Sequence, residues 1–181
     1  MYRIGDYSMR PIEEGDLRQI LEWRNSDEVH SMMLTDHKIT WEEHCRWFEK
    51  IQQEPVKCHF VFEYQGHPVG YIGYNDFDES ARTCTPGMYL GDRKTAPADA
   101  GLYLSYMAGK YAFEELGVEK IILEIFSKNK RALSINNMTG QEGEHYCIKK
   151  SSKRETVVRT ETTREEYLKN REASRHLFED F

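Results

Sequence analysis

The chain has 181 residues, 39% hydrophobic and 31% charged, a composition typical of one folded domain and not of a disordered or fibrous protein. Its formal net charge of −6 argues against broad nucleic-acid binding. No apolar run approaches the roughly 18 to 20 residues that span a bilayer, and the first residues lack the apolar centre of a signal peptide. We therefore expect a single domain over residues 1–181, located in the cytoplasm and without membrane contact.

The cysteines and histidines do not form a metal-binding pattern. The four cysteines are scattered, with no C-x-x-C pair and no histidine at metal-ligand spacing. This favours reduced thiols and predicts no metal site. The seven histidines form no cluster, and His37 and His44 are only weak candidates for a catalytic base.

The first elements of the chain are a short strand and a helix. Residues 8–12 read as a strand that ends where Pro11 removes a hydrogen-bond donor. Asp16 is placed to cap a helix whose apolar residues lie on one side and which ends near Arg24. Residues 26–38 lack helical rhythm and predict a loop or a broken helix.

A second helix and a hairpin follow. Thr40 and Glu43 have the spacing of a capping box, which opens a helix with one apolar stripe. Residues 57–64 and 69–74 read as two strands, and the segment 65–68 between them has the composition of a hairpin turn.

The remaining strands suggest a mostly antiparallel sheet. A third strand, 81–90, follows a turn at 75–79, and a long helix over 102–116 ends at Gly117, a C-terminal cap. Residues 120–126 are apolar on both faces, which predicts a strand at the centre of a sheet under helices.

The end of the chain predicts a hairpin and a helix. Residues 144–150 and 155–162 read as its two strands, joined over residues 151–154, and a polar helix opens at 163.

The segment 83–137 carries the first indication of function. Tiny residues at 96–101 lead into the long helix, and such a helix start offers free backbone N–H groups and a positive dipole end. This predicts a site for a phosphorylated ligand. Five basic residues lie within the segment, on either side of the long helix: Arg93, Lys94, Lys128, Lys130 and Arg131.

With its order of strand, turn, helix, strand and helix, the chain resembles the GCN5-related N-acetyltransferase (GNAT) superfamily over essentially its full length. In that family a loop of pattern Arg/Gln-x-x-Gly-x-Gly/Ala holds the coenzyme A pyrophosphate on backbone N–H groups. Here the loop falls on residues 96–101, where only Gly101 is retained: Ala96 replaces the basic residue and Asp99 the first glycine. We expect Asp99 to point to solvent or to cap the helix, with Arg93 and Lys94 offsetting its charge.

Two further segments support the resemblance. Residues 129–132, Asn-Lys-Arg-Ala, resemble the family's Asn-x-x-Ala, and residues 140–143 stand where the family has Gly-Phe and then Glu-Gly. The resemblance implies an α/β GNAT fold: a single mixed, mostly antiparallel twisted sheet of six or seven strands, helices on both faces, and a splayed parallel strand pair at the cofactor cleft. It also implies acetyl-CoA as cosubstrate, and contacts to it from Leu90, Gly91, Arg93, Lys94, Ala96, Ala98, Asp99, Ala100, Gly101, Asn129 and Ala132.

More narrowly, residues 21–25, 39–41, 89–91 and 123–125 resemble a subgroup acting on nucleotide-linked amino sugars in pseudaminic acid biosynthesis. The acceptor implied is the 4-amino group of UDP-4-amino-4,6-dideoxy-N-acetyl-β-L-altrosamine or a similar sugar, for surface or flagellar glycans. The implied substrate contacts are Arg24, Met33, Trp47 and Tyr89, because a flat base favours aromatic or thioether surface and a diphosphate favours a guanidinium. Met33 and Trp47 are also explained by core packing, and Arg24 by contacts at the helix end.

Two residues are candidates for catalysis. Glu124 interrupts an otherwise apolar strand at the position of a family glutamate near the acceptor amine, which implies that it accepts the proton of the sugar ammonium. The alternative is a strand with a partly exposed face. Asn136 stands where the family has a tyrosine that gives a proton to the departing thiolate, and an amide cannot give up that proton near neutral pH. Either solvent protonates the thiolate, or another residue serves, or Asn136 is a plain polar residue.

Two rival functions remain open from the sequence. One is acetylation of a protein N-terminus, as in ribosomal-protein acetyltransferases, and the other is a catalytically silent acyl-CoA-binding module. The edge of the C-terminal hairpin is a candidate for pairing across a homodimer.

Overall fold

The structure is a computed structural model that describes residues 1–54, 56, 58–137, 143–174 and 178. The chain forms two compact units: unit 1 consists of Met1–Gly73 and Met88–Ala100, and unit 2 of Tyr74–Gly87 and Gly101–Phe181. The expectation that residues 1–181 act as a single domain stays a prediction. In the described part of the chain, none of the helices has the length and apolarity needed to span a bilayer.

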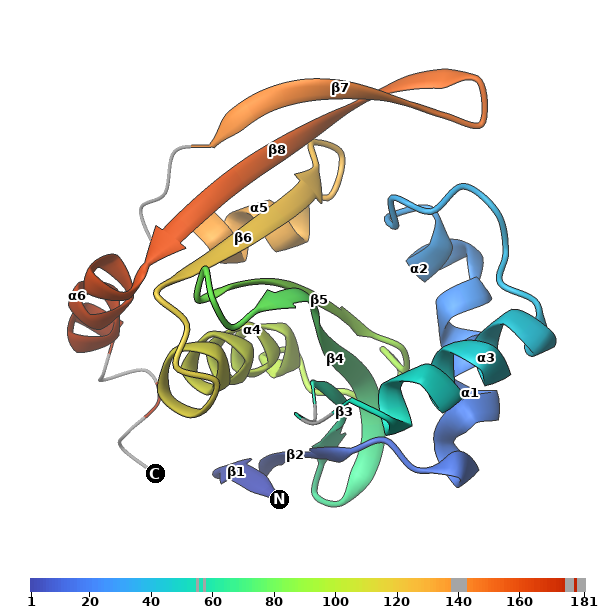
Figure 1. Cartoon of the computed structure of the whole chain (residues 1–181), viewed down its shortest axis with the longest axis horizontal. Helices are drawn as coiled ribbons and strands as arrows, with labels where there is room; N and C mark the ends of the chain where they lie inside the picture. Colours follow the sequence, from blue (N-terminus) through green and yellow to red (C-terminus); the bar gives the residue numbers. More distant parts are fainter. Residues whose placement is uncertain (55, 57, 138–142, 175–177, 179–181) are drawn as a thin grey trace. The chain divides into compact units, whose positions relative to one another are not determined.

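Backbone hydrogen bonds join the strands into one sheet in the order β1-β2-β3-β4-β5-β6-β8-β7 (Figure 1). Helices lie between groups of these strands along the chain, so the predicted α/β class is confirmed. The described residues contain eight strands where six or seven were expected. The additional strand is β1 (Tyr2–Ile4), which pairs antiparallel with β2 (Tyr7–Pro11). It was not predicted because three residues are too few to show a periodicity.

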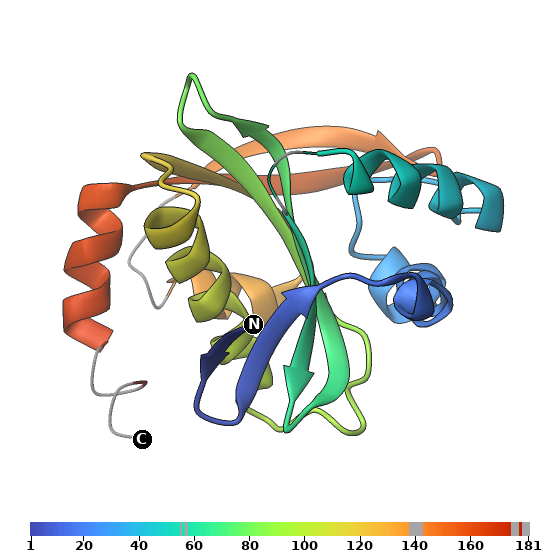
Figure 2. The same ribbon diagram turned by 60° about the horizontal axis from the view of Figure 1, so that its bottom comes forward.

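Unit 1 contains the first strands and the first helices. After β1 and β2 come the short helix η1 (Glu14–Asp16), α1 (Leu17–Asn25), α2 (Asp27–His30), α3 (Trp41–Gln52), β3 (His59–Tyr64), and parts of β4 (His67–Asp78) and β5 (Thr83–Leu90). The helices α1 and α3 lie side by side in both views (Figure 1 and Figure 2). The buried core beside them consists of Ile12, Leu17, Ile20, Trp23 and Val61.

The two predicted helix starts of unit 1 have different outcomes. The capping box of α3 is confirmed, because Thr40 Oγ1 accepts from the Glu43 N–H at 3.2 Å and Glu43 accepts from the Thr40 N–H at 2.8 Å. Asp16 lies at the N-cap position of α1 as predicted, but its side chain makes no capping hydrogen bond to that helix. The helical run begins one turn earlier, at η1, and the Asp16 carboxylate instead accepts from the Glu13 N–H and pairs with Arg10 at 2.7 Å.

The hairpin between β3 and β4 has a shorter turn than predicted. The turn is Gln65-Gly66, and both residues have positive φ, 50° and 80°, as a two-residue hairpin turn requires. Strand β4 therefore begins at His67 and continues to Asp78, so the turn expected at 75–79 is wrong. Pro68 lies within this strand next to a register shift, where a missing donor is tolerated. Lys57, the expected start of β3, lies outside the described residues.

Unit 2 contains the rest of β4 and β5 and the remaining elements. These are α4 (Ala100–Lys110), which starts at the boundary and continues into a π-helical turn η2 (Tyr111–Glu115), then β6 (Lys120–Phe126), α5 (Lys130–Asn137), β7 (Glu144–Lys150), β8 (Lys153–Thr163) and α6 (Arg164–Ser174). The prediction for β6 is confirmed over its full range, and so is Gly117 as the helix end, with φ +67°.

Strands β5 and β6 form the parallel pair that the GNAT fold implies. Their ladder is confined to two residue pairs, Thr83↔Lys120 and Cys84↔Ile121. Both strands continue well beyond these pairs, so the predicted splayed pair is present. On its other side β6 pairs antiparallel with β8 over its whole length, and β8 forms with β7 the long orange hairpin of Figure 1.

Candidate active site

An aromatic cluster in unit 1 gathers side chains from four elements. It consists of Trp47 on α3, His59 on β3, Tyr71 on β4 and Tyr89 on β5. Trp47 lies edge-on to His59 with ring centroids 5.4 Å apart, and Tyr71 stacks on Tyr89 at 5.2 Å. The His59 Nδ1 atom and the Tyr71 hydroxyl are hydrogen bonded at 2.8 Å. Since Tyr71 and Tyr89 also pack on the core beside α1, the cluster is fixed by the fold.

Burial keeps the titratable members of the aromatic cluster neutral at pH 7. It lowers the pKa of His59 from 6.5 to about 4, because a charged imidazole would lose its hydration. It raises the pKa of both Tyr71 and Tyr89. The cluster therefore offers flat, uncharged surface with a few polar atoms.

Arg24 brings a positive charge to this surface. It lies in the last turn of α1, and its Nη1 atom is buried without a hydrogen-bond partner among the described residues. Burial lowers the pKa of Arg24, while the nearby Tyr89 and Tyr71 oppose that shift. A guanidinium nitrogen that is buried and unpaired costs free energy unless a ligand satisfies it. The site can therefore receive an anionic group beside an aromatic face.

The structure thus brings together three of the four predicted substrate residues, namely Arg24, Trp47 and Tyr89. Met33 lies in the turn after α2, where its N–H donates to the His30 carbonyl at 3.1 Å, and its part in binding stays a prediction. His59 and Tyr71 were missed. Their only signal in the sequence is that both lie in predicted strands, and it is the β3–β4 register that places them together.

The two histidines considered as weak base candidates have structural explanations. His44 is 5% exposed and stacks on Trp47 with centroids 5.0 Å apart, and burial lowers its pKa. His37 is exposed and pairs with Glu43 at 3.1 Å.

The end of β5 holds Gly91 for a packing reason. A Cβ at this position would overlap the indole ring of Trp23, so only glycine fits. The Gly91 N–H donates to the Val69 carbonyl at 2.9 Å, inside unit 1. The contact of Leu90 and Gly91 with acetyl-CoA stays a prediction, and that N–H already has a protein partner.

The loop before α4 is organised by its own residues. The Asp92 carboxylate accepts from the N–H groups of Lys94, at 3.0 Å, and Thr95, at 3.3 Å. The N–H groups of Ala96 and Ala100 donate to carbonyls inside the loop.

At the exposed turn that follows, the N–H groups of Ala98 and Asp99 donate to no acceptor in the described part of the chain. A turn with small side chains and two such N–H groups fits a pyrophosphate held on the backbone.

Asp99 and Arg93 make other contacts than expected. Asp99 is exposed, as predicted, but its carboxylate accepts from the Tyr7 hydroxyl at 2.6 Å instead of capping the helix. Arg93 pairs with Glu28 at 2.9 Å. Tyr7 therefore holds the acidic group that replaces a family glycine.

Unit 2 contains the two candidate catalytic residues. Glu124 is half-buried on β6, and its Oε1 atom accepts from the hydroxyl of Tyr146 on β7 at 2.8 Å. Burial and the Glu124 carboxylate raise the pKa of Tyr146 to about 12. Asn136 is buried on α5, at 7% exposed.

The predicted cofactor residues of unit 2 lie at the starts of two helices, α4 and α5. The Oδ1 atom of Asn129 accepts from the Ala132 N–H at 3.3 Å, which explains an asparagine there as a helix cap. Gly101 lies in the first turn of α4. Their contacts with acetyl-CoA stay predictions, and residues 140–142 of the family pattern lie outside the described residues.

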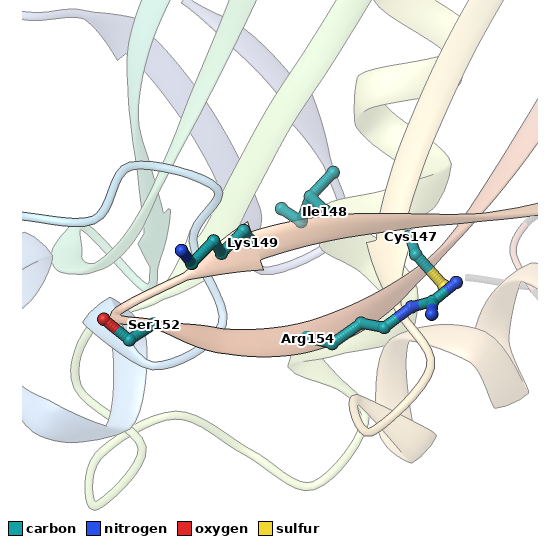
Figure 3. A pocket seen from close by; sticks show the side chains of 5 residues that line it. All are labelled: Cys147, Ile148, Lys149, Ser152 and Arg154. Atoms are coloured by element: carbon teal, nitrogen blue, oxygen red, sulfur yellow. The ribbon is translucent and has the colours of Figure 1, made fainter.

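A surface pocket in unit 2 contains none of the predicted residues. It is lined by the β7–β8 hairpin, and the Cys147 sulfur lies beside the Arg154 guanidinium (Figure 3). Arg154 lowers the pKa of the Cys147 thiol by donating a hydrogen bond to it. The described residues contain no group of three or more His, Cys, Asp or Glu that could hold a metal ion.

Comparison with solved structures shows a known fold. The spermidine N-acetyltransferase of Vibrio cholerae, solved in complex with CoA and spermine, superposes with a TM-score of 0.81 at 20% identity, covering 90% of this chain and 98% of that one. A putative phosphinothricin N-acetyltransferase gives a TM-score of 0.72 at 21% identity, covering 87% and 98%. Both chains share the fold of acetyltransferases.

The family follows from the sequence match. The family model described as acetyltransferase (GNAT) domain matches residues 7–140, so the chain belongs to the GNAT acetyltransferase family. It is an acetyl-CoA-dependent N-acetyltransferase. Among curated proteins it is similar to Acetyltransferase PseH of Campylobacter jejuni subsp. jejuni serotype O:23/36, with 28% identity over 143 residues, covering 75% of this chain and 87% of the relative. PseH of serotype O:2 is also 28% identical, over 144 residues.

Proposed function

We propose that the enzyme transfers acetyl from acetyl-CoA to the 4-amino group of a nucleotide-activated amino sugar. The acceptor would be UDP-4-amino-4,6-dideoxy-N-acetyl-β-L-altrosamine or a close relative, made for pseudaminic acid on surface or flagellar glycans. The similarity to PseH over 75% of the chain supports this acceptor class. The observation that carries the proposal is the buried Nη1 atom of Arg24, for which the described part of the chain offers no hydrogen-bond partner.

The charge of Arg24 distinguishes between acceptor classes. A guanidinium beside neutral tyrosines attracts a diphosphate and repels a polycation such as spermidine, the amine class named for the Vibrio cholerae neighbour. Trp47 and the stacked pair Tyr71 and Tyr89 supply flat surface that suits a nucleotide base. A peptide N-terminus has neither a diphosphate for the guanidinium nor a flat base for the aromatic rings.

The reaction needs a base for the acceptor amine and a proton source for the departing thiolate. Glu124 takes a proton from the sugar ammonium, and the free amine then attacks the thioester carbonyl. As the C–S bond breaks, its electron pair leaves on the coenzyme A sulfur, and the attacking nitrogen gives its second proton to solvent, which leaves the neutral amide. Because Asn136 cannot give up a proton, the thiolate takes its proton from solvent. Acetyl-CoA supplies the acyl group, and the backbone at Ala98 and Asp99 would hold its pyrophosphate.

The test compares acceptors and an Arg24 variant. We expect acetyl transfer to the UDP-4-amino sugar but not to spermidine or to a ribosomal-protein N-terminal peptide. Hydrogen bonds to charged groups contribute about 1.5 to 3 kcal/mol, so Arg24→Met should raise KM for the sugar about tenfold to a hundredfold. KM for acetyl-CoA should stay unchanged.

The matched control is Arg18→Met, which removes an exposed arginine from the same helix and should leave both KM values unchanged. Faster transfer to spermidine or to the peptide than to the sugar would contradict the proposal. So would an unchanged KM for the sugar in Arg24→Met.

A further inference from the structure

The Glu124 carboxylate has one hydrogen-bond partner in the described part of the chain, the hydroxyl of Tyr146. Oε1 accepts this hydrogen bond at 2.8 Å, and Oε2 accepts from no described residue. One oxygen is therefore fixed by the protein, and the other is available to an acceptor amine or a water molecule.

The sheet register explains how two strands that are not neighbours share this contact. Glu124 on β6 lies opposite Arg159 on β8, and Tyr146 on β7 lies opposite Val157 on β8. Arg159 and Val157 are two positions apart, so all four side chains stand on one face of the sheet. The Tyr146 side chain crosses β8 above the fully buried Val157 to reach the carboxylate.

The basic side chains near Glu124 pair with another carboxylate. Arg159, opposite Glu124, is paired at 2.9 Å with Glu161, and Glu161 also accepts from Lys120 at 2.8 Å. Among the described residues, Glu124 is in no ion pair of its own.

We infer that Tyr146 is a positioning residue for the acetyl transfer: its hydroxyl holds Oε1 of Glu124, so that Oε2 is aimed at the acceptor amine. This inference rests on the proposed role of Glu124 as the base. No bond of Tyr146 forms or breaks in the reaction. The raised pKa of Tyr146 keeps its proton on the phenol at neutral pH, so the hydroxyl remains a donor through each turnover.

The geometry also fits the absence of a tyrosine at Asn136. Tyr146 belongs to a different element, β7, and it donates to the base rather than to the leaving group. Tyr146 therefore supports deprotonation of the amine, while the thiolate takes its proton from solvent.

A double-mutant cycle tests the inference. Kinetics are measured for Glu124→Gln, Tyr146→Phe and the double variant, with the amine that the native enzyme acetylates fastest. A hydrogen bond to a charged group is worth about tenfold to a hundredfold in rate, so Tyr146→Phe should lower kcat by that factor. KM for acetyl-CoA should not change. The double variant should be no slower than Glu124→Gln alone, because Tyr146 acts only through the carboxylate.

A matched control is available in the same unit. The Tyr167 hydroxyl donates to Glu114 at 2.9 Å, so Tyr167→Phe removes a similar tyrosine–glutamate hydrogen bond. It should leave kcat unchanged when rates are referred to folded protein.

The outcomes separate this inference from the proposed function. Native kcat in Tyr146→Phe, together with an impaired Glu124→Gln, would overturn the inference alone. The inference alone would also be overturned if the fold-losses in kcat of the two single variants multiplied in the double variant. Native kcat in Glu124→Gln would overturn the proposed base and the inference with it. Failure of the UDP-sugar as acceptor would overturn only the proposed substrate, since the cycle is run with whichever amine is acetylated.

Discussion

His59 shows how burial at one residue changes the pH dependence of the whole protein. The side chain is 8% exposed and its pKa is lowered from 6.5 to about 4. Above pH 6.5 the imidazole is neutral in both the folded and the unfolded chain, so its titration does not change the free energy of unfolding there. Between 6.5 and about 4 only the unfolded chain takes up the proton, and stability falls as the pH falls.

The corresponding variant is His59→Asn, which removes the titration and keeps an amide near the position of Nδ1. The native protein should lose about 2 kcal/mol more than this variant between about pH 7.5 and about pH 5. Urea unfolding at both pH values measures the difference. His67→Asn removes an exposed histidine and should follow the native protein. Equal pH dependence of His59→Asn and the native protein would contradict the burial argument.

At the scale of elements, the end of β5 is fixed by its contact with α1. The glycine at position 91 lets the strand approach the indole ring of Trp23, which is 8% exposed. A residue predicted from a family pattern thus has a packing explanation that does not depend on the cofactor.

Gly91→Ala should therefore destabilise the protein by about 1 to 3 kcal/mol, because the new methyl group forces Trp23 out of its place in the core. Unfolding by urea measures the loss. Gly15→Ala is the control, since no atom lies within 4 Å of its added Cβ and the position has no positive φ. If Gly91→Ala were as stable as Gly15→Ala, the Trp23 ring would be able to move aside at little cost in free energy, and the packing argument would be wrong.

At the scale of the whole molecule, ligands provide the broadest test of the proposed function. A ligand that binds only the folded state stabilises it, by about 2.7 kcal/mol at a hundredfold excess over Kd. Acetyl-CoA and UDP-sugar should each raise Tm, and together they should raise it further. The shift with UDP-sugar should be at least halved in Arg24→Met at the same ligand concentration, and the shift with acetyl-CoA should be retained.

Differential scanning fluorimetry measures these shifts. A shift with acetyl-CoA alone would favour a protein or peptide acceptor over the nucleotide sugar. An unchanged Tm with both ligands would contradict the assignment of both sites.

The sequence by itself determined several local elements and the family. The capping box at Thr40 and Glu43, the helix end at Gly117 and the range of β6 depend on residues close together in the chain, so periodicity and spacing predict them. The pattern of short segments was sufficient for the GNAT assignment that the family match confirms.

Only the tertiary structure decided which side chains meet. The Tyr7–Asp99 contact joins residues 92 positions apart, and the Tyr146–Glu124 contact joins residues 22 apart across an intervening strand. The physical reason is that strand register sets such contacts, and a shift of one residue turns every side chain to the other face. Composition and spacing do not fix that register.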